Sequence, residues 1–268
     1  MPTIDAGGVR LHYQEIGVGP PVVLMHGLGS SCDDWQHQVH ALAGHYRVVS
    51  FDARGHGRSE RPPGPWTLLD MAADAAALLG ALELAPAHLV GVSMGAMVGI
   101  ELAAREPTLV RSVAAINLPL DLRLHTFRHW RIYLQRRLLI TLGGMPLVAQ
   151  VLGRKLFPDP HQAELRRLFR QRWRRNDRWS YLKAMRALIA WDPTGRLEAI
   201  PCPVLLVAAE HDYWPPAARQ AQIAALRHGE LAVIPSSRHA TPADQPEALN
   251  RVLLDFLGRV EGYAPAIV

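Results

Sequence analysis

Hydrophobic and polar positions along the chain follow two alternating patterns. Short apolar runs predict strands at residues 22–25, 48–51, 88–92, 110–116, 204–207 and 231–234. Between most of them, apolar residues recur at helical spacing, which predicts helices near residues 33–45, 67–83, 94–105, 217–226 and 247–259. Runs that are apolar on both strand faces are typical of buried parallel sheets. The pattern therefore predicts an α/β fold, a mostly parallel sheet with helices on both faces.

Two segments depart from this alternation. Residues 2–16 alternate weakly around Gly7-Gly8, which predicts a hairpin of two edge strands. Residues 120–190 show a mostly helical pattern interrupted by glycine and proline, so we expect a helical cap inserted into a core formed by residues 1–119 and 191–268. Because ligands bind outside the carboxyl ends of parallel strands, a cap leaving from that edge would cover the site.

The bulk composition limits the functional class. The chain has 268 residues and only two cysteines, Cys32 and Cys202, which cannot form a disulfide framework and favour a reducing compartment. The first residues lack the basic and apolar regions of an export signal. The longest apolar run, residues 138–152, is interrupted and shorter than the ~20 residues that span a bilayer. We therefore expect a cytoplasmic protein without a transmembrane segment.

Positive charge is concentrated in the expected cap. Residues 120–190 contain 14 Arg and two Lys against four acidic residues, a net charge of +12, so the rest of the chain carries −7 of the overall +5. Such arginines are often simply a solvated face, but they also fit an anionic substrate or surface. Nucleic-acid binding is not expected, because it would block the mouth of the site.

The strongest chemical signal is Gly91-Val92-Ser93-Met94-Gly95, where a predicted strand runs into a helix. A serine on such a sharp turn, a nucleophile elbow, projects its hydroxyl towards both a base and a substrate. The turn is crowded, so only glycines fit two residues before and after Ser93. The alternative is an ordinary serine in a glycine-flanked strand-to-helix turn, which partner residues would have to exclude.

A serine nucleophile needs a base and an acid. His239 lies between the last predicted strand and the last helix, and Asp212 lies in the loop after the strand at 204–207. The order Ser93, Asp212, His239 is the one that nucleophile-elbow enzymes use for their catalytic triad. A surface role remains the alternative for His239, and Asp121 and Glu210 are weaker candidates for the acid.

The oxyanion hole requires two backbone N–H donors. Met94, directly after Ser93, supplies one, and Leu28, in the loop after the first buried strand, is the best candidate for the other. No metal is expected, because the histidines lack ligand spacing. No cofactor is expected either, because no Gly-x-Gly-x-x-Gly follows a strand.

These motifs together carry a family resemblance. They are His26-Gly27-Leu28-Gly29, Asp52-Ala53-Arg54-Gly55-His56-Gly57-Arg58-Ser59, Gly91-Val92-Ser93-Met94-Gly95 and the pair Asp212 and His239. In this order they resemble the α/β-hydrolase superfamily, in its lidded serine esterase and lactonase branch. The resemblance implies a structural role for residues 52–59, so His56 is not expected to be catalytic. Ser93 stands where dehalogenases and epoxide hydrolases of this fold use aspartate, which argues against both.

The expected activity is therefore hydrolysis of a small-molecule carboxylic ester through an acyl-enzyme on Ser93. The same residues suit a lactone, thioester or C–C substrate, or acyl transfer to an acceptor other than water, and the sequence does not separate these. A binding protein that keeps the fold without catalysis is the alternative from another class, and the intact serine, acid and histidine argue against it. The oligomeric state is not predicted.

Overall fold

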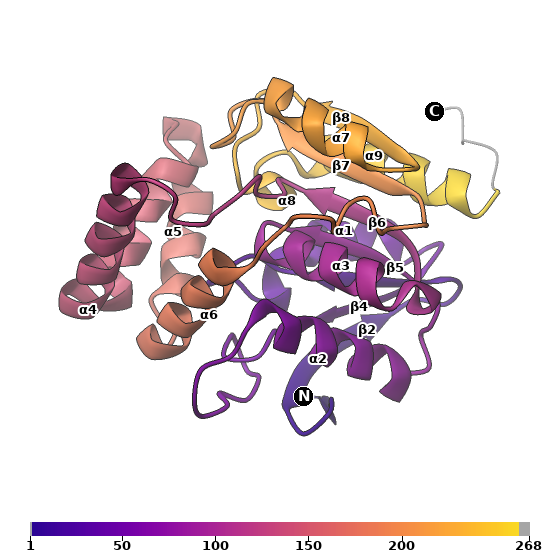
Figure 1. Ribbon diagram of the computed structural model, residues 1–268, viewed down its shortest axis with the longest axis horizontal. Helices are drawn as coiled ribbons and strands as arrows, with labels where there is room; N and C mark the ends of the chain where they lie inside the picture. The colour runs from indigo at the N-terminus through magenta and orange to yellow at the C-terminus, as the bar shows by residue number, and fades with distance from the viewer. Residues whose placement is uncertain (1, 263–268) are drawn as a thin grey trace.

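The computed structural model describes residues 2–262, which form one eight-stranded sheet with helices around it (Figure 1). The strand order is β1-β2-β4-β3-β5-β6-β7-β8, and every pairing from β4 to β8 is parallel. The strands are β1 (Thr3–Asp5), β2 (Arg10–Ile16), β3 (Pro21–Met25), β4 (Arg47–Phe51), β5 (Ala87–Val92), β6 (Val110–Ile116), β7 (Val204–Ala209) and β8 (Gly229–Ile234). The predicted mostly parallel sheet is confirmed, and β1 and β2 form the antiparallel edge hairpin.

Different helices pack on the two faces of the sheet. The helices are α1 (Gln36–Leu42), α2 (Leu68–Ala81), α3 (Met94–Arg105), α4 (Phe127–Leu156), α5 (Ala163–Trp173), α6 (Arg178–Ala190), α7 (Gln220–Ala225), α8 (Thr241–Asp244) and α9 (Pro246–Val260). Along β3, Val23 and Met25 join the apolar cluster under α2 and α3, whereas Val22 and Leu24 join the cluster under α1 and α9. This period-two alternation explains why the strand reads as a continuous apolar run.

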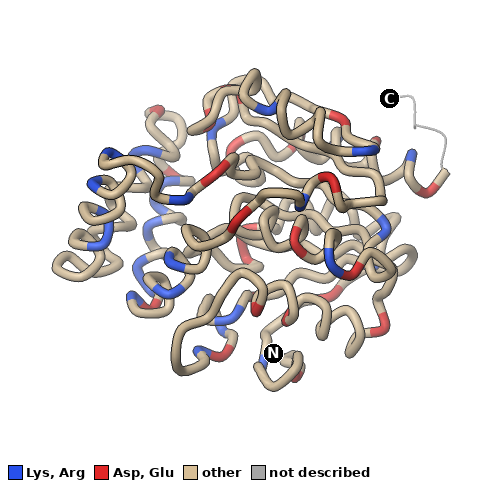
Figure 2. The backbone as a smooth tube through the Cα atoms, viewed as in Figure 1, with Lys and Arg blue, Asp and Glu red and all other residues tan. Residues whose placement is uncertain are grey.

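Residues between β6 and β7 leave the sheet and form a separate group of helices. In Figure 1, α4, α5 and α6 stand together beside the strands, and they share a small apolar cluster that includes Ile140, Trp173 and Tyr181. Gly144 adopts a non-helical φ of 65°, so α4 consists of two helical segments joined by a kink at this residue. Lys and Arg positions are frequent along these helices, with few acidic residues between them (Figure 2).

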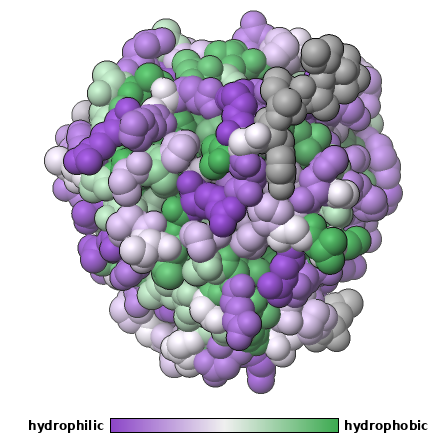
Figure 3. Space-filling model, turned by 90° about the vertical axis from the view of Figure 1, so that its right-hand side faces the viewer, coloured by the Kyte–Doolittle hydropathy of each residue, from purple (hydrophilic) through white to green (hydrophobic). Residues whose placement is uncertain are grey.

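The face on the other side of the molecule from the inserted helices carries hydrophilic residues with small hydrophobic areas between them (Figure 3). Among residues 2–262, no helix combines the length and the apolar character needed to cross a bilayer.

Candidate active site

Ser93 occupies the turn between β5 and α3 in a strained conformation. Its φ is 54° and its ψ is −108°, a backbone region that residues with a side chain rarely adopt and that often marks functional sites. The Ser93 N–H donates to Ile116 O of the neighbouring strand over 2.9 Å, which fixes the turn to the sheet. The Ser93 side chain is therefore held at the carboxyl edge of the sheet.

The two flanking glycines are required by close backbone contacts. A Cβ on Gly91 would lie 2.3 Å from the carbonyl carbon and oxygen of Gly95, and a Cβ on Gly95 would lie 2.0 Å from Met25 O. Neither contact can be relieved by moving a flexible side chain, because both involve backbone atoms. The start of α3 thus packs directly on β3, and this packing sets the position of Ser93.

The loop after β3 runs beside Ser93. A Cβ on Gly27 would lie 3.7 Å from the Ser93 Cβ. His26 fixes this loop, since its Nδ1–H donates to Gly27 O at 2.8 Å and its Nε2 accepts from Ala53 N at 3.0 Å. Burial lowers the pKa of His26, which keeps the ring neutral and able to accept that bond.

The backbone N–H groups of Met94 and Leu28, the two candidate oxyanion donors, have no acceptor among the described residues. Met94 is the first residue of α3, where N–H groups have no intrahelical acceptor. Within residues 2–262, the Leu28 N–H donates to no protein backbone or side-chain group. Both donors are thus available to an oxygen that enters from the substrate side.

Asp212 and His239 meet in the loops after β7 and β8. Asp212 Oδ1 accepts from His239 Nδ1 over 2.6 Å, with the Asp212 side chain buried and the His239 side chain 18% exposed. This bond orients the ring and leaves Nε2 free for proton transfer. In the described part of the chain, Ser93 Oγ makes no hydrogen bond with His239, a geometry common in catalytic sites without substrate.

Asn117 joins the two loops and was missed by the sequence analysis. It follows β6 with φ 49° and is completely buried. Its Oδ1 accepts from Ala209 N at 2.8 Å, and its Nδ2 donates to His239 O at 3.0 Å and to Thr241 Oγ1 at 2.9 Å. A polar residue at the end of an apolar strand was the available signal. Asn117 therefore sets the spacing between the end of β7 and the histidine loop.

Arg219 is a second partner of Asp212 that the sequence analysis did not identify. Its Nη2 lies 3.1 Å from Asp212 Oδ2, and both side chains are inaccessible to solvent. Its Nη1 donates to Leu118 O and to Gln222 Oε1. Burial lowers the pKa of Arg219 although Asp212 raises it, so the carboxylate compensates a buried cation.

The alternative acids do not contact His239. Hydrogen bonds from Arg123 and His125 lower the pKa of Asp121 to about 2, against the opposing effect of partial burial. Glu210 is exposed and accepts from Ser236 N at 2.8 Å. Asp212 is thus the carboxylate that the fold brings to His239.

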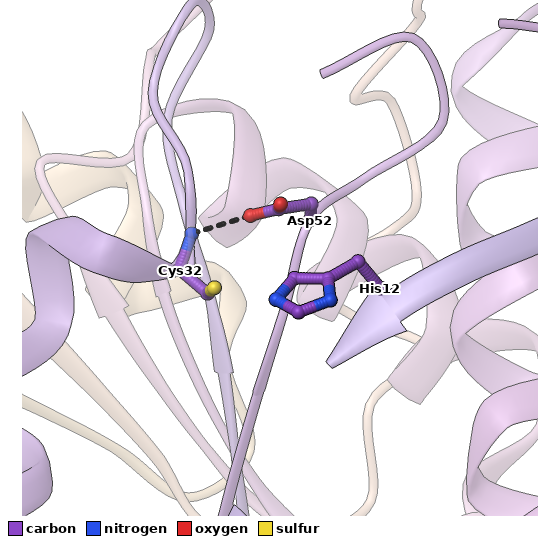
Figure 4. A group of neighbouring side chains, drawn as sticks. All are labelled: His12, Cys32 and Asp52. Carbon is purple, nitrogen blue, oxygen red and sulfur yellow. Dashed lines mark hydrogen bonds between the residues drawn. The ribbon is translucent and has the colours of Figure 1, made fainter. Parts of the chain in front are cut away.

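His12 of β2, Cys32 in the turn before α1 and Asp52 after β4 form a second cluster (Figure 4). Cys32 N donates to Asp52 Oδ1 at 2.7 Å. The Arg58 guanidinium donates to Cys32 Sγ at 3.0 Å and to Asp52 Oδ2 at 3.1 Å, so a protein cation already neutralises the Asp52 carboxylate. Burial raises the pKa of the Cys32 thiol, which disfavours the thiolate that a metal would need. The contacts indicate a structural cluster.

His56 lies outside the Ser93 site. It is buried, its Nδ1 donates to Arg54 O at 3.0 Å, and burial lowers its pKa to about 3. Such a ring remains neutral at physiological pH and is a weak base, poorly matched to general-base catalysis near pH 7.

Comparisons with known proteins agree with this architecture. The model of the Alpha/beta hydrolase family matches residues 22–252. A protein named carbamate hydrolase RutD from Azorhizobium caulinodans is 30% identical, covering 97% of this chain and all of its own length. The (E)-2-((N-methylformamido)methylene)succinate hydrolase of Acinetobacter baylyi is 29% identical, covering 92% of this chain and 93% of its own. Among solved structures, the enol-lactonase from Burkholderia xenovorans has a TM-score of 0.87 at 27% identity, covering 96% of this chain and 99% of its own.

The family match spans most of the chain, and the relatives are covered over nearly their whole length. The chain belongs to the alpha/beta hydrolase family and is a hydrolase.

Proposed function

We propose that the protein hydrolyses a carboxylic ester, open or cyclic, through an acyl-enzyme on Ser93. The observations that carry this proposal are the strained serine turn after β5 and, in the loops after β7 and β8 at the same edge of the sheet, an aspartate–histidine pair whose Asp212 Oδ1 to His239 Nδ1 distance is 2.6 Å. The solved relative named as an enol-lactonase supports a cyclic ester as one form of substrate.

In the first half-reaction, His239 Nε2 takes the Ser93 hydroxyl proton while Oγ attacks the ester carbonyl carbon. The negative oxygen of the tetrahedral intermediate accepts hydrogen bonds from the N–H groups of Leu28 and Met94. The carbon–oxygen bond to the alcohol then breaks, and His239 returns the proton to the leaving oxygen. Asp212 stays ionised and orients the imidazole.

In the second half-reaction, water replaces the alcohol. His239 removes a proton from the water as its oxygen attacks the acyl carbon, and the same two N–H groups bind the oxyanion again. Collapse releases the carboxylic acid and returns the proton to Ser93 Oγ. Residues 120–190 act in this proposal as a cap over the site, on a core of residues 1–119 and 191–268.

The test combines a covalent probe with turnover. A fluorophosphonate should label the wild-type protein and fail to label Ser93→Ala, and a panel of p-nitrophenyl esters and lactones should identify a substrate. On that substrate, Ser93→Ala should lose on the order of 10⁶ in kcat. A variant that retained a tenth of wild-type activity would exclude Ser93 as the nucleophile.

A further inference from the structure

Among the arginines of the inserted helices, Arg136 differs in where it points. It lies in the first half of α4, and its Nη2 donates to the hydroxyl of Tyr181 on α6. The Arg136 Cζ lies 5.6 Å from the centroid of the Tyr181 ring. The Nε of Arg136 is buried and has no hydrogen-bond partner. Arg136 thus faces the interior of the helical group, not the solvent.

No protein anion compensates this cation. Among residues 2–262, no carboxylate lies within ion-pair distance of Arg136, whereas Arg123, Arg167 and Arg172 each pair with one. Burial lowers the pKa of Arg136, but the Tyr181 hydroxyl and Tyr213 raise it, and the net shift is upward. The side chain therefore stays charged. A buried N–H without an acceptor is destabilising, and an incoming acceptor would remove that cost.

Tyr181 links Arg136 to the loop that carries Leu28. A Cβ on Gly29 would lie 2.8 Å from Tyr181 Cε2, so the ring edge rests on that glycine. Leu28 itself packs on the apolar cluster of the inserted helices. Gly27 of the same loop packs near Ser93, so Tyr181 contacts the loop that carries the proposed Leu28 donor.

Tyr213 connects the inserted helices to His239. The centroid of its ring lies 4.6 Å from that of His239, and the positive charge of Arg136 lowers the pKa of its hydroxyl against the larger, opposing effect of burial. The Nζ of Lys155, at the other end of α4, lies 4.5 Å from the same ring centroid. Lys155 of α4 thus contacts the tyrosine that packs against His239, and Arg136 of the same helix contacts Tyr181, which packs on the Leu28 loop.

We propose that Arg136 and Tyr181 form a carboxylate-binding subsite in the roof of the active site, so the preferred substrate is an ester that carries a free carboxylate. A guanidinium presents paired N–H donors that match the two oxygens of one carboxylate. The Tyr181 hydroxyl is positioned to add a further donor once the guanidinium turns to the ligand. This inference rests on the proposed function for its location, but not for its binding chemistry.

The test compares two esters of similar length, monomethyl glutarate and methyl pentanoate, by methanol release. The wild type should prefer the glutarate ester in kcat/KM. In Arg136→Gln the ratio of the two kcat/KM values should fall about 10- to 100-fold, mainly through KM for the glutarate ester, because a charge-assisted bond is lost. Arg136→Lys should retain part of the ratio.

Arg137→Gln is the matched control, since Arg137 is the next residue of α4 and is exposed. It removes the same charge from the same helix and should leave the ratio at its wild-type value. A wild-type ratio near one, an unchanged ratio in Arg136→Gln, or an equal fall in Arg137→Gln would each overturn the subsite.

Binding without turnover separates this inference from the proposed chemistry. Calorimetric titration of Ser93→Ala with monomethyl glutarate should show binding that Ser93→Ala/Arg136→Gln lacks. If fluorophosphonate labels the protein but both esters bind equally well, the serine mechanism is supported and the subsite is excluded. If monomethyl glutarate binds through Arg136 but the protein resists labelling, the subsite is supported and the serine mechanism is excluded.

Discussion

Replacing Asn117 by alanine tests whether the hydrogen bonds behind His239 position the catalytic histidine. The change removes a buried bond from Ala209 N, a buried bond to Thr241 Oγ1 and a partly buried bond to His239 O. At about 1 kcal/mol for each bond, the loss is about 3 kcal/mol. Alanine at φ 49° adds about 1 kcal/mol, because asparagine tolerates this conformation better. We expect Asn117→Ala to lower the free energy of unfolding by about 4 kcal/mol.

The catalytic effect should accompany the structural one. A shift of about 1 Å in a catalytic group costs about 10²-fold in rate, so kcat/KM should fall by that factor at a temperature where the variant remains folded. Urea unfolding and ester hydrolysis measure the two quantities on the same preparation.

Asn250→Ala provides the matched control. Asn250 of α9 accepts from Gln38 Nε2 and donates to His37 O, both on α1, and among the described residues it has no bond to His239. Its loss should cost about 1–2 kcal/mol of stability and leave kcat/KM unchanged. If Asn117→Ala kept kcat/KM within three-fold of wild type while losing stability, the positioning argument would be wrong.

Three further predictions concern the acid, a buried histidine and the serine turn. Asp212→Asn should lower kcat about 10⁴-fold on the same ester while Asp121→Asn stays near wild type, and the reverse ranking would reassign the acid. Burial lowers the pKa of His88 to about 4, below its unfolded value, so its contribution to stability is full above pH 6.5 and declines as the pH falls towards 4. The wild type should thus lose about 2 kcal/mol between pH 7 and 5 that His88→Asn does not lose, as measured by urea unfolding. Gly95→Ala should destabilise the fold by about 3 kcal/mol, because its methyl group meets Met25 O, and unchanged thermal unfolding would contradict that contact.

The sheet was predictable because burial on both faces leaves a simple pattern. The strands from 21 to 116 appear in the sequence as apolar runs and in the structure within one or two residues of those limits. β7 and β8 are longer than predicted, since β7 ends in two alanines and β8 begins with Gly229 and Glu230, which carry little strand signal.

The residues of the candidate site differ in how far the sequence could predict them. Ser93, Asp212 and His239 could be proposed from their places after β5, β7 and β8, and their roles remain predictions. Asn117 was marked only as a polar residue after an apolar strand, and neither its partners nor the burial of Arg219 could be proposed, because they depend on loops that meet only after folding. Arg136 was hidden for another reason: 14 arginines look alike in the insertion, and only the bend at Gly144 and the packing on Tyr181 distinguish this one.

The place where the inserted helices join the sheet has a consequence for how the protein can change. β6 and β7 are parallel neighbours, with Val113 opposite Val204, so the whole insertion is one enlarged crossover between adjacent strands. The entropic contribution to the free energy of closing such a connection rises by only about 0.6 kcal/mol for each doubling of its length. A longer, shorter or foreign segment can therefore span the same two strands at small cost, while the turn that holds Ser93 tolerates no added methyl group. Diversity of substrates is then a property of the exchangeable crossover, and constancy of the chemistry is a property of the sheet.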